Sequence, residues 1–251
     1  MSTRIDVSVI IPVYNETVRL TSGLEKVLLY LTRQRFTWEL IVVDDGSSVS
    51  VARMIDRAVD QKILRFPIKK LPVSVYRLSK NMGKGRAIAH GVEKAHGKLI
   101  IFTDVDLSVS IEMVKPLLTA LKRYPVVIGS RRKYGSKIVV HQSFFRESGG
   151  RLFTFLSNAI CNVGVSDVTC GFKGFTRDAA KSLFRFQKIH RWVFDTEIVF
   201  LARKKGMRVF ELPVSWVNKS GSKVRLWDSV VSLIDLFRIQ WNDILGKYNE
   251  S

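Results

Sequence analysis

Two carboxylates separated by one residue follow a short apolar run. The run 99–103 reads Leu-Ile-Ile-Phe-Thr and leads directly into Asp104-Val105-Asp106. In an extended chain the side chains at i and i+2 point to the same side, so these two carboxylates can converge on one cation. Mg²⁺ or Mn²⁺ commonly bridges such carboxylates to substrate phosphates. The alternative for an isolated Asp-X-Asp is a solvated surface turn, so the pattern needs support from elsewhere in the chain.

Two further apolar runs end in polar groups that could bind a ligand. The run 40–43 leads into Asp44-Asp45-Gly46-Ser47, and the run 7–11 leads into Pro12-Val13-Tyr14-Asn15-Glu16. In an open α/β sheet, ligands bind at the carboxyl ends of the strands. Three such endings therefore predict one shared site at one edge of a sheet.

A glycine-rich turn supplies a possible phosphate contact. Residues 81–86 read Asn-Met-Gly-Lys-Gly-Arg, between a predicted strand and a predicted helix. Glycines there let backbone N–H groups approach a phosphate, and Lys84 adds a mobile cation. The spacing matches neither the Walker loop nor the dinucleotide-binding glycine pattern, so the alternative is an ordinary helix start beside a turn.

The elements that must position these residues alternate along the first half of the chain. Hydrophobic spacing predicts strands at 7–13, 39–43, 73–78, 99–103 and 126–129, with helices at 16–33, 49–59, 83–95 and 111–123. This alternation is typical of an α/β protein with a mostly parallel, doubly wound sheet flanked by helices.

The pattern changes after Ser130. A basic loop at 131–137 precedes an amphipathic helix at 144–163 and a short glycine-rich element at 170–175. Helices at 177–184 and 194–205, a strand at 209–217 and an amphipathic terminal helix at 227–245 complete the prediction. The chain contains no internal repeat, low-complexity tract or flexible linker, so we expect a single domain over residues 1–251.

The charge is unusual for a chain of ordinary hydrophobic content. Against 41 Lys and Arg stand 22 Asp and Glu, a formal net charge of +19. Such a surface suits nucleic acid, anionic lipid or phosphorylated substrates. A nucleic-acid-binding protein would interleave its basic residues with exposed aromatic residues or show a recognised binding fold. Neither pattern is found, so we expect no nucleic-acid partner.

Cysteine usage and hydropathy indicate the compartment. Cys161 and Cys170 form neither a disulfide framework nor a metal cluster, which favours a reducing environment. No apolar run reaches the roughly 18–20 residues that cross a bilayer, and the first residues do not resemble a signal peptide. We expect a cytoplasmic protein that associates at most peripherally with a membrane.

The motifs together resemble family 2 glycosyltransferases of the GT-A fold. They occur in the family's order: residues 9–16, Val42-Val43-Asp44-Asp45-Gly46-Ser47, residues 81–85 and Asp104-Val105-Asp106. The second half is similar to the dolichyl-phosphate β-glucosyltransferase branch, close kin of the dolichyl-phosphate mannosyltransferases. That similarity lies in residues 129–131, 144–146, 169–173 and 191–197, and the whole resemblance covers about residues 7–241.

The resemblance implies a role for each candidate residue. Residues 1–130 would form the nucleotide-sugar-binding half, and residues 131–251 the acceptor-binding half with its membrane-facing helices. A Mg²⁺ or Mn²⁺ ion would be held by Asp104 and Asp106. The nucleotide sugar would contact Pro12, Tyr14, Glu16, Asp44, Gly46, Lys84 and Asp104, and the acceptor phosphate would contact Arg131, Arg146 and Lys173. The catalytic group would comprise Asp106, Arg131, Asp195 and Glu197, the last two on the sugar side.

The residue types agree with a phosphate acceptor. An alcohol acceptor normally requires a general base, whereas a phosphate monoester is already largely dianionic at neutral pH. The chain has many Lys and Arg residues after residue 130 and few histidines, none at metal-ligand spacing. Together with the resemblance, this gives the leading hypothesis: inverting, metal-dependent transfer of glucose from UDP-glucose to a polyprenyl (dolichyl) phosphate, which would give a lipid-linked sugar for glycan assembly.

Several alternatives remain open from the sequence. Mannose, N-acetylglucosamine or GDP could replace the donor parts, and a non-catalytic basic protein binding nucleic acid or membrane is the distant alternative. Asp195 and Glu197 could be a solvated helix start. Arg131 and Arg146 could be general surface basicity. The oligomeric state is not predicted.

Membrane contact is expected without a spanning helix. Members of the glucosyl branch often carry an N-terminal membrane anchor, and this sequence shows none. We expect the protein to bind an anionic membrane surface on the cytoplasmic face. Residues 144–155, with their phenylalanines beside Arg146 and Arg151, are the main candidate. The terminal helix either packs across the sheet or lies in the membrane interface with Trp241 as an anchor.

Overall fold

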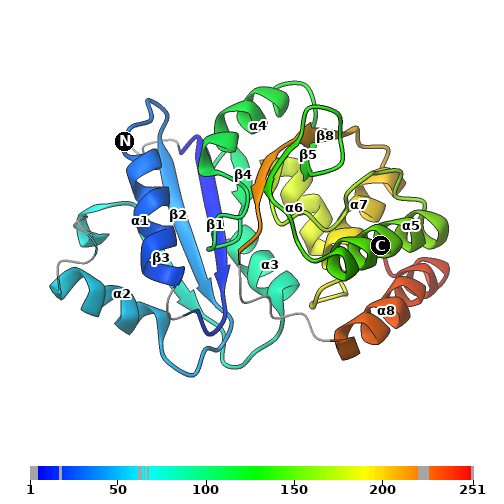
Figure 1. Ribbon diagram of the computed structural model, residues 1–251, viewed down its shortest axis with the longest axis horizontal. Coiled ribbons are helices and arrows are strands. Elements are labelled where there is room, and N and C mark those ends of the chain that lie inside the picture. Colours follow the sequence, from blue (N-terminus) through cyan, green and yellow to red (C-terminus); the bar gives the residue numbers. More distant parts are fainter. Residues whose placement is uncertain are drawn as a thin grey trace.

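A seven-stranded sheet forms the centre of the molecule (Figure 1). The computed structural model describes residues 5–16, 19–61, 64, 66, 68–219 and 226–249 of the 251-residue chain. The expectation of no signal peptide rests in part on residues 1–4, which lie outside the described residues. In spatial order the strands are β3 (Val73–Arg77), β2 (Trp38–Asp44), β1 (Val7–Val13), β4 (Leu99–Phe102), β7 (Lys173–Thr176), β5 (Val126–Ser130) and β8 (Val209–Pro213).

The register brings the predicted strand ends to one edge. In the parallel β1–β2 pair Val13 lies opposite Asp44, and in the β2–β3 pair Asp44 lies opposite Arg77. On the other side of β1, Ile10 pairs with Phe102, so the chain leaves β4 beside the end of β1. The mostly parallel α/β arrangement predicted from the alternating pattern is confirmed.

One strand in the middle of the sheet runs against the others. The glycine-rich element expected at 170–175 contains β7, which pairs antiparallel with both β4 and β5. A Cβ atom at Gly174 would lie 2.4 Å from a terminal methyl group of Leu117, so a larger residue at this point of the strand would require the leucine side chain to move. The sequence at 170–175 did not indicate a central strand, because it contains two glycines and glycine has a low strand propensity.

Helices cover both faces of the sheet, as alternate strand side chains require. Val9 and Ile11 pack with α1 (Arg19–Leu31), α2 (Val51–Asp60) and α4 (Val114–Ala120). Ile10 points to the other face, which is covered by α3 (Lys84–Lys94), α6 (Arg177–Arg185) and α7 (Phe194–Lys204). Short 3₁₀ turns lie at Ile68–Lys70 and Ile111–Met113.

The strand expected at 209–217 is divided between two sheets. Pro213 ends β8, and after Val214 the chain continues as β9 (Ser215–Val217), which pairs with β6 (Lys137–Val140). Val214 N–H donates to Ser130 O at 3.1 Å and Val214 O accepts from Lys137 N–H at 3.1 Å, so this residue links the two ladders. A uniform apolar pattern carries no signal for such a change of partner.

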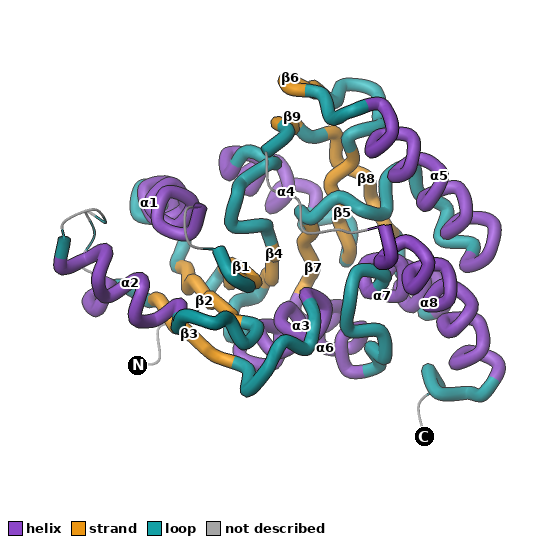
Figure 2. Tube along the Cα trace, turned by 60° about the horizontal axis from the view of Figure 1, so that its bottom comes forward, coloured by secondary structure: helices purple, strands orange, loops and turns teal. Residues whose placement is uncertain are grey.

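Two helices with exposed apolar faces lie together at the far end from α1 and α2 (Figure 2). They are α5 (Phe144–Cys161) and α8 (Leu226–Ile244), and they contact each other. Phe144 and Phe145 are 79% and 87% exposed, whereas Phe153 packs against the core. Other exposed side chains are Leu152, Phe155, Val230, Leu233, Ile234, Phe237, Trp241 and Ile244.

The terminal helix packs against the protein along one side and leaves an apolar side exposed. Leu236 and Ile239 of α8 are fully buried, while its opposite side is apolar and exposed. Among the residues that the structure describes, no helix combines the length and the apolar character that a membrane crossing requires.

Candidate active site

The two carboxylates after β4 each have a cationic neighbour. Asp104 Oδ1 lies 2.6 Å from the Nζ of Lys84 at the start of α3. Asp106 Oδ2 lies 3.5 Å from a guanidinium nitrogen of Arg19, and its Oδ1 accepts a 2.9 Å hydrogen bond from Ser108 N–H. Both carboxylates are partly exposed. The segment is therefore an ordered turn with accessible carboxylates.

Asp45 holds the glycine-rich turn in place. Its carboxylate accepts hydrogen bonds from Met82 N–H at 2.7 Å, Gly83 N–H at 2.9 Å and the Asn81 side-chain amide at 3.0 Å. Burial raises the pKa of the Asp45 carboxyl, against the lowering effect of these bonds. Sequence analysis noted Asp45 only beside Asp44. The sequence does contain a clue to this role of Asp45. The backbone N–H groups of a glycine turn need acceptors, and an acidic residue at a strand end can supply them.

Asp44 shapes the turn from β2 into α2. It is 1% exposed and accepts from Ser47 N–H at 2.8 Å and Val51 N–H at 3.3 Å. Gly46 within this turn has a φ of +70°, a conformation that favours glycine. Both residues were predicted to contact the nucleotide, and they lie at the carboxyl end of β2.

The segment after β1 meets the same turn. Asn15 N–H donates to Ser47 Oγ at 2.9 Å, and Ser48 N–H donates to Asn15 Oδ1 at 2.9 Å. Tyr14 is 37% exposed, and Glu16 forms a 2.7 Å ion pair with Arg19. Arg19 in turn faces Asp106, so the ends of β1 and β4 share one electrostatic network.

Alternating charges continue from Lys84 into the protein interior. Asp195 lies close enough to Lys84 for each charge to shift the pKa of the other, and it forms an ion pair with Lys173. Burial lowers the pKa of Lys84, but Asp104, Asp195 and Asp106 outweigh this effect and raise it overall. Burial raises the pKa of the Asp195 carboxyl despite its two lysine neighbours. The arrangement keeps Lys84 charged beside two carboxylates.

Lys173 is enclosed at the inner end of this row. Its side chain is 0% exposed, and Nζ donates to Val168 O at 3.0 Å, to Cys170 O at 2.7 Å and to Asp195. Lys173 was predicted to contact an acceptor phosphate. The three donors of the ammonium group already have partners, so the geometry gives it the role of holding Asp195.

Gly171 leaves room for the side chains of Asp104 and Lys84 to approach each other. A Cβ atom at this position would lie 2.1 Å from Asp104 Oδ2 and 3.1 Å from Lys84 Nζ. Any side chain there would displace the Asp104 carboxylate. The neighbouring Cys170 is buried, and burial raises the pKa of its thiol to about 11, which leaves it protonated at neutral pH.

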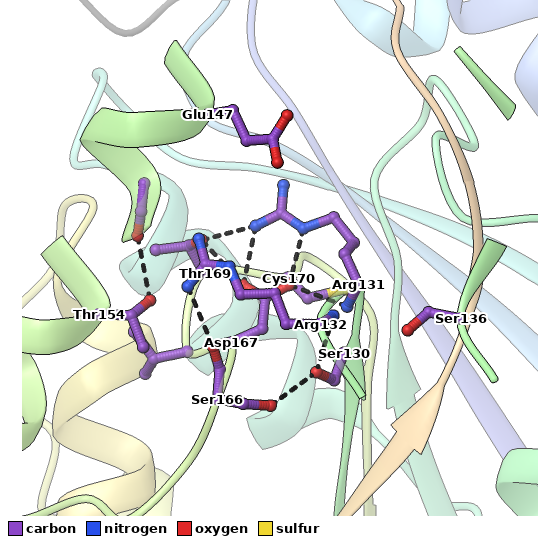
Figure 3. Close-up of polar contacts among 12 residues, drawn as sticks. Ser130, Arg131, Arg132, Ser136, Glu147, Thr154, Ser166, Asp167, Thr169 and Cys170 are labelled. Carbon is purple, nitrogen blue, oxygen red and sulfur yellow. Dashed lines mark hydrogen bonds and ion pairs between the residues drawn. The ribbon is translucent and has the colours of Figure 1, made fainter. Parts of the chain in front are cut away.

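Arg131 is fixed by a carboxylate that sequence analysis missed (Figure 3). Its Nε and one Nη lie 2.7 and 2.8 Å from the two oxygens of Asp167, and the same Nη donates to Thr169 Oγ1 at 2.7 Å. Asp167 is fully buried, and Arg131 holds the pKa of its carboxyl below the usual range although burial opposes this. No local sequence pattern pairs residues 36 positions apart.

The turn after Arg131 contacts α5 (Figure 3). Arg132 donates to Ser166 O at 2.9 Å, and a Cβ atom at Gly150 of α5 would lie 3.3 Å from the Arg132 guanidinium. Arg146, one helical turn earlier, is exposed. The basic loop and the apolar helix are thus neighbours.

Glu197 does not pair with Lys84 or Lys173, the lysines that neighbour Asp195. It is 0% exposed and accepts hydrogen bonds from Lys188 N–H, Ile189 N–H and the hydroxyl of Tyr248. Burial raises the pKa of its carboxyl to about 7, against the lowering effect of these bonds. Glu197 was predicted on the sugar side together with Asp195; the helix places the two carboxylates in different surroundings.

The carboxylates present suit a substrate-completed metal site. Within the described part of the chain no group of three or more His, Cys, Asp or Glu side chains is placed to hold a metal ion. Mg²⁺ is typically bound by one or two carboxylates plus substrate phosphates and water. Asp104 and Asp106, two partly exposed oxygen ligands following one strand, fit that donor set.

Comparison with known proteins shows the family of the chain. The family model described as "Glycosyl transferase family 2" matches residues 8–184. A dolichyl-phosphate beta-glucosyltransferase of Trichomonas vaginalis is 36% identical over 245 residues, covering 93% of this chain and 72% of the relative. The human protein of the same name is 32% identical, covering 96% of this chain and 76% of the relative.

Solved structures share the fold. The glucosyl-3-phosphoglycerate synthase of Mycobacterium tuberculosis, crystallised with Mn²⁺, uridine diphosphate and glucosyl-3-phosphoglycerate, aligns with a TM-score of 0.62. The alignment covers 98% of this chain and 81% of that one at 15% sequence identity. On the strength of the family model and of relatives matched over nearly the full chain, this protein belongs to glycosyl transferase family 2.

Proposed function

We propose that the protein transfers glucose from UDP-glucose to a polyprenyl phosphate of the dolichyl type, with inversion at the anomeric carbon. The observation that carries the proposal is the Lys84–Asp104 ion pair with Asp106 beside it, at the edge where three strands end. Relatives over nearly the whole chain are named dolichyl-phosphate beta-glucosyltransferases, which supports glucose and dolichyl phosphate as the substrates.

The donor would lie along the ends of β1, β2 and β4. Pro12, Tyr14, Glu16, Asp44 and Gly46 would border the nucleoside. Lys84 would approach the diphosphate, where a cation offsets the charge that develops on the leaving group. This division makes residues 1–130 the donor half of the molecule and residues 131–251 the acceptor half.

A divalent ion would be held by Asp104 and Asp106. Bound there with the donor diphosphate, Mg²⁺ or Mn²⁺ would supply Lewis-acid stabilisation of the leaving group. Solved structures of similar fold that hold uridine diphosphate with Mn²⁺ or Mg²⁺ support this choice of ion. The remaining contributions come from side chains of the protein.

The acceptor would be positioned by cations rather than deprotonated by a base. An oxygen of its phosphate attacks the anomeric carbon and forms the new C–O bond, while the bond to the diphosphate breaks and UDP leaves with the electron pair. Arg131 keeps one Nη clear of the Asp167 and Thr169 hydrogen bonds, and Arg146 is exposed on α5, so both could meet the acceptor phosphate. Asp195, held by Lys173, would face the sugar.

The lipid would be reached from the membrane surface. The exposed apolar faces of α5 and α8 provide a surface for the bilayer interface, and the net charge of +19 favours anionic lipid. Since α5 contacts the turn that follows Arg131, a lipid headgroup at this helix would lie near the acceptor arginines. The proposed location is the cytoplasmic face of a membrane, where nucleotide sugars are available.

A donor panel tests the proposal. Purified protein is incubated with Mg²⁺, a short polyprenyl phosphate and, in separate reactions, UDP-glucose, GDP-mannose and UDP-N-acetylglucosamine. We expect a lipid-linked glucose product from UDP-glucose with a kcat/KM at least roughly a hundredfold above that of the other donors, which corresponds to a few well-placed contacts. Preference for GDP-mannose would overturn the donor assignment, and hydrolysis without lipid product would overturn the acceptor assignment.

A further inference from the structure

The carboxylate of Glu197 is saturated by donors from within the protein. Lys188 N–H and Ile189 N–H lie 3.0 and 2.9 Å from its oxygens, and the Tyr248 hydroxyl lies 2.5 Å away. Glu197 and Tyr248 are 0% and 2% exposed. A substrate hydroxyl cannot approach this carboxylate without displacing a buried partner. The group therefore holds the segment that follows α6.

That segment packs directly on the glycine-rich turn. His190 O accepts a 3.2 Å hydrogen bond from Arg86 N–H, and a Cβ atom at Gly83 would lie 2.5 Å from the same carbonyl oxygen. A Cβ atom at Gly85 would lie 2.7 Å from the side-chain nitrogen of Gln187. The turn that carries Lys84 is thus closely packed against residues 187–190. A shift of these residues would therefore also shift the turn.

Tyr248 extends the connection to the end of α8. Its ring lies 6.0 Å from that of Phe200, and its hydroxyl accepts a 3.4 Å hydrogen bond from the Asn242 side chain. A 2.6 Å ion pair between Lys204 and Asp243 joins α7 to α8 at the same place. Residues 242–248 are therefore anchored to the helix that carries Glu197.

We propose that Glu197 is a positioning residue for donor binding. Its carboxylate holds residues 188 and 189, and their neighbours Gln187 and His190 pack on the Gly83–Gly85 turn. The turn in its place presents Lys84 to the donor diphosphate. Tyr248 completes the anchor and ties the donor turn to α8. The identity of the donor rests on the proposed function; the mechanical connection rests on the contacts above.

Three variants separate positioning from chemistry. In Glu197→Gln the amide oxygen still accepts from the backbone N–H groups and the amide nitrogen reaches the Tyr248 oxygen, whereas Glu197→Ala removes the anchor and Tyr248→Phe removes one hydrogen bond. Tyr124→Phe, a change on a tyrosine that stacks on Phe210 in the opposite hydrophobic cluster, is the matched control. Each variant is tested for UDP affinity by calorimetry, for kcat and both KM values, and for amide hydrogen exchange.

The expected result is a selective effect on the donor. Tyr248→Phe should weaken UDP binding and raise the donor KM roughly threefold to tenfold, the effect of one hydrogen bond, with kcat and acceptor KM within about twofold. Glu197→Ala should weaken both further, and Glu197→Gln should recover most of the loss. Amide exchange should rise in residues 83–90 and 186–192 of Tyr248→Phe and stay unchanged in Tyr124→Phe.

Two outcomes would overturn the proposal. A loss of kcat by orders of magnitude in Glu197→Gln with normal UDP affinity would make Glu197 a catalytic carboxylate. Unchanged exchange at residues 83–90 in Glu197→Ala and Tyr248→Phe would show that the anchor does not reach the donor turn. Absence of UDP binding by the wild-type protein would instead refute the proposed donor, while the exchange data would still decide the positioning.

Discussion

The Nζ atom of Lys84 lies 2.6 Å from Oδ1 of Asp104, an ion pair that joins the start of α3 to the end of β4. Gly171 packs against both charged groups. A negatively charged diphosphate would meet a lysine that is already held in place and whose pKa is raised by neighbouring carboxylates. In the proposed function, this pair would be preorganised for an anion that arrives with a divalent cation.

Replacing Lys84 by Met should weaken donor binding. The loss of one charge-assisted contact is expected to raise the UDP dissociation constant roughly tenfold to a hundredfold. Calorimetric titration with UDP in the presence of Mg²⁺ provides the measurement. Lys122→Met, which removes an exposed lysine beyond α4, is the matched control. Equal UDP affinity in the two variants would contradict the role of Lys84.

Replacing Asp106 by Asn should remove metal-dependent turnover. Mutation of the residues that hydrogen-bond to metal ligands typically lowers metal affinity or activity by roughly 10- to 100-fold. Loss of a ligand itself should therefore reduce turnover by more than roughly a hundredfold. The melting temperature should stay near that of the wild type because the side chain is partly exposed. Asp56→Asn on α2 is the control. Full activity of the wild type in excess EDTA would refute the metal site.

Replacing either acceptor arginine, Arg131 or Arg146, should raise the acceptor KM, but only the replacement of Arg131 should lower the stability of the protein. Arg146→Ala should raise the acceptor KM with unchanged UDP affinity and unchanged stability, because its side chain is exposed. Arg131→Ala should also destabilise the protein by about 3–5 kcal/mol, since it leaves the buried Asp167 without its partner. Urea unfolding and acceptor kinetics give both quantities. If Arg146→Ala lowers only UDP affinity, the acceptor assignment is wrong.

Membrane binding should depend on the exposed face of α5. The triple replacement of Phe144, Phe145 and Phe155 by Ser removes apolar area that is already exposed, so the fold should be preserved. Cosedimentation with anionic liposomes should decrease, while UDP affinity stays unchanged. Leu29→Ser on α1 is the control on the opposite side of the molecule. Equal sedimentation of the triple variant and the wild type would leave α8 or charge alone as the membrane contact.

The stability of the protein should depend on pH through Glu197. The pKa of its carboxyl is about 7 in the folded protein, above the ordinary value of 4.5, so the folded state binds the proton more tightly than the unfolded chain. The stabilisation is fully present below about pH 4.5 and is lost as the pH rises through about 7. The wild type should lose on the order of 3 kcal/mol relative to Glu197→Gln over this interval. Parallel pH profiles of the two proteins would refute this.

Local patterns predicted the strands and helices of the first half because each strand is a short apolar run, each helix has a helical apolar period, and each ends at a turn. Residues 7–13 and 99–103 are examples, and their carboxyl ends marked the site edge. Lys173 and Glu197 show the limit of this reasoning: adjacent sequence made them site residues, and burial by distant segments gave them other partners. Asp167 and Tyr248 were missed because their partners, Arg131 and Glu197, lie far away in the sequence.

The antiparallel strand β7 also constrains how the chain can acquire its structure during synthesis. β4 and β5 are complete by residue 130, yet neither gains its shared neighbour until residues 173–176 have left the ribosome. Until then both strands present unpaired backbone edges, which favour intermolecular association. Pairing between strands so far apart in the sequence is slow, because the entropy cost of closing the loop arises before the contacts can stabilise the pair. The nascent chain therefore passes through a stage in which β4 and β5 expose edges that the folded sheet covers.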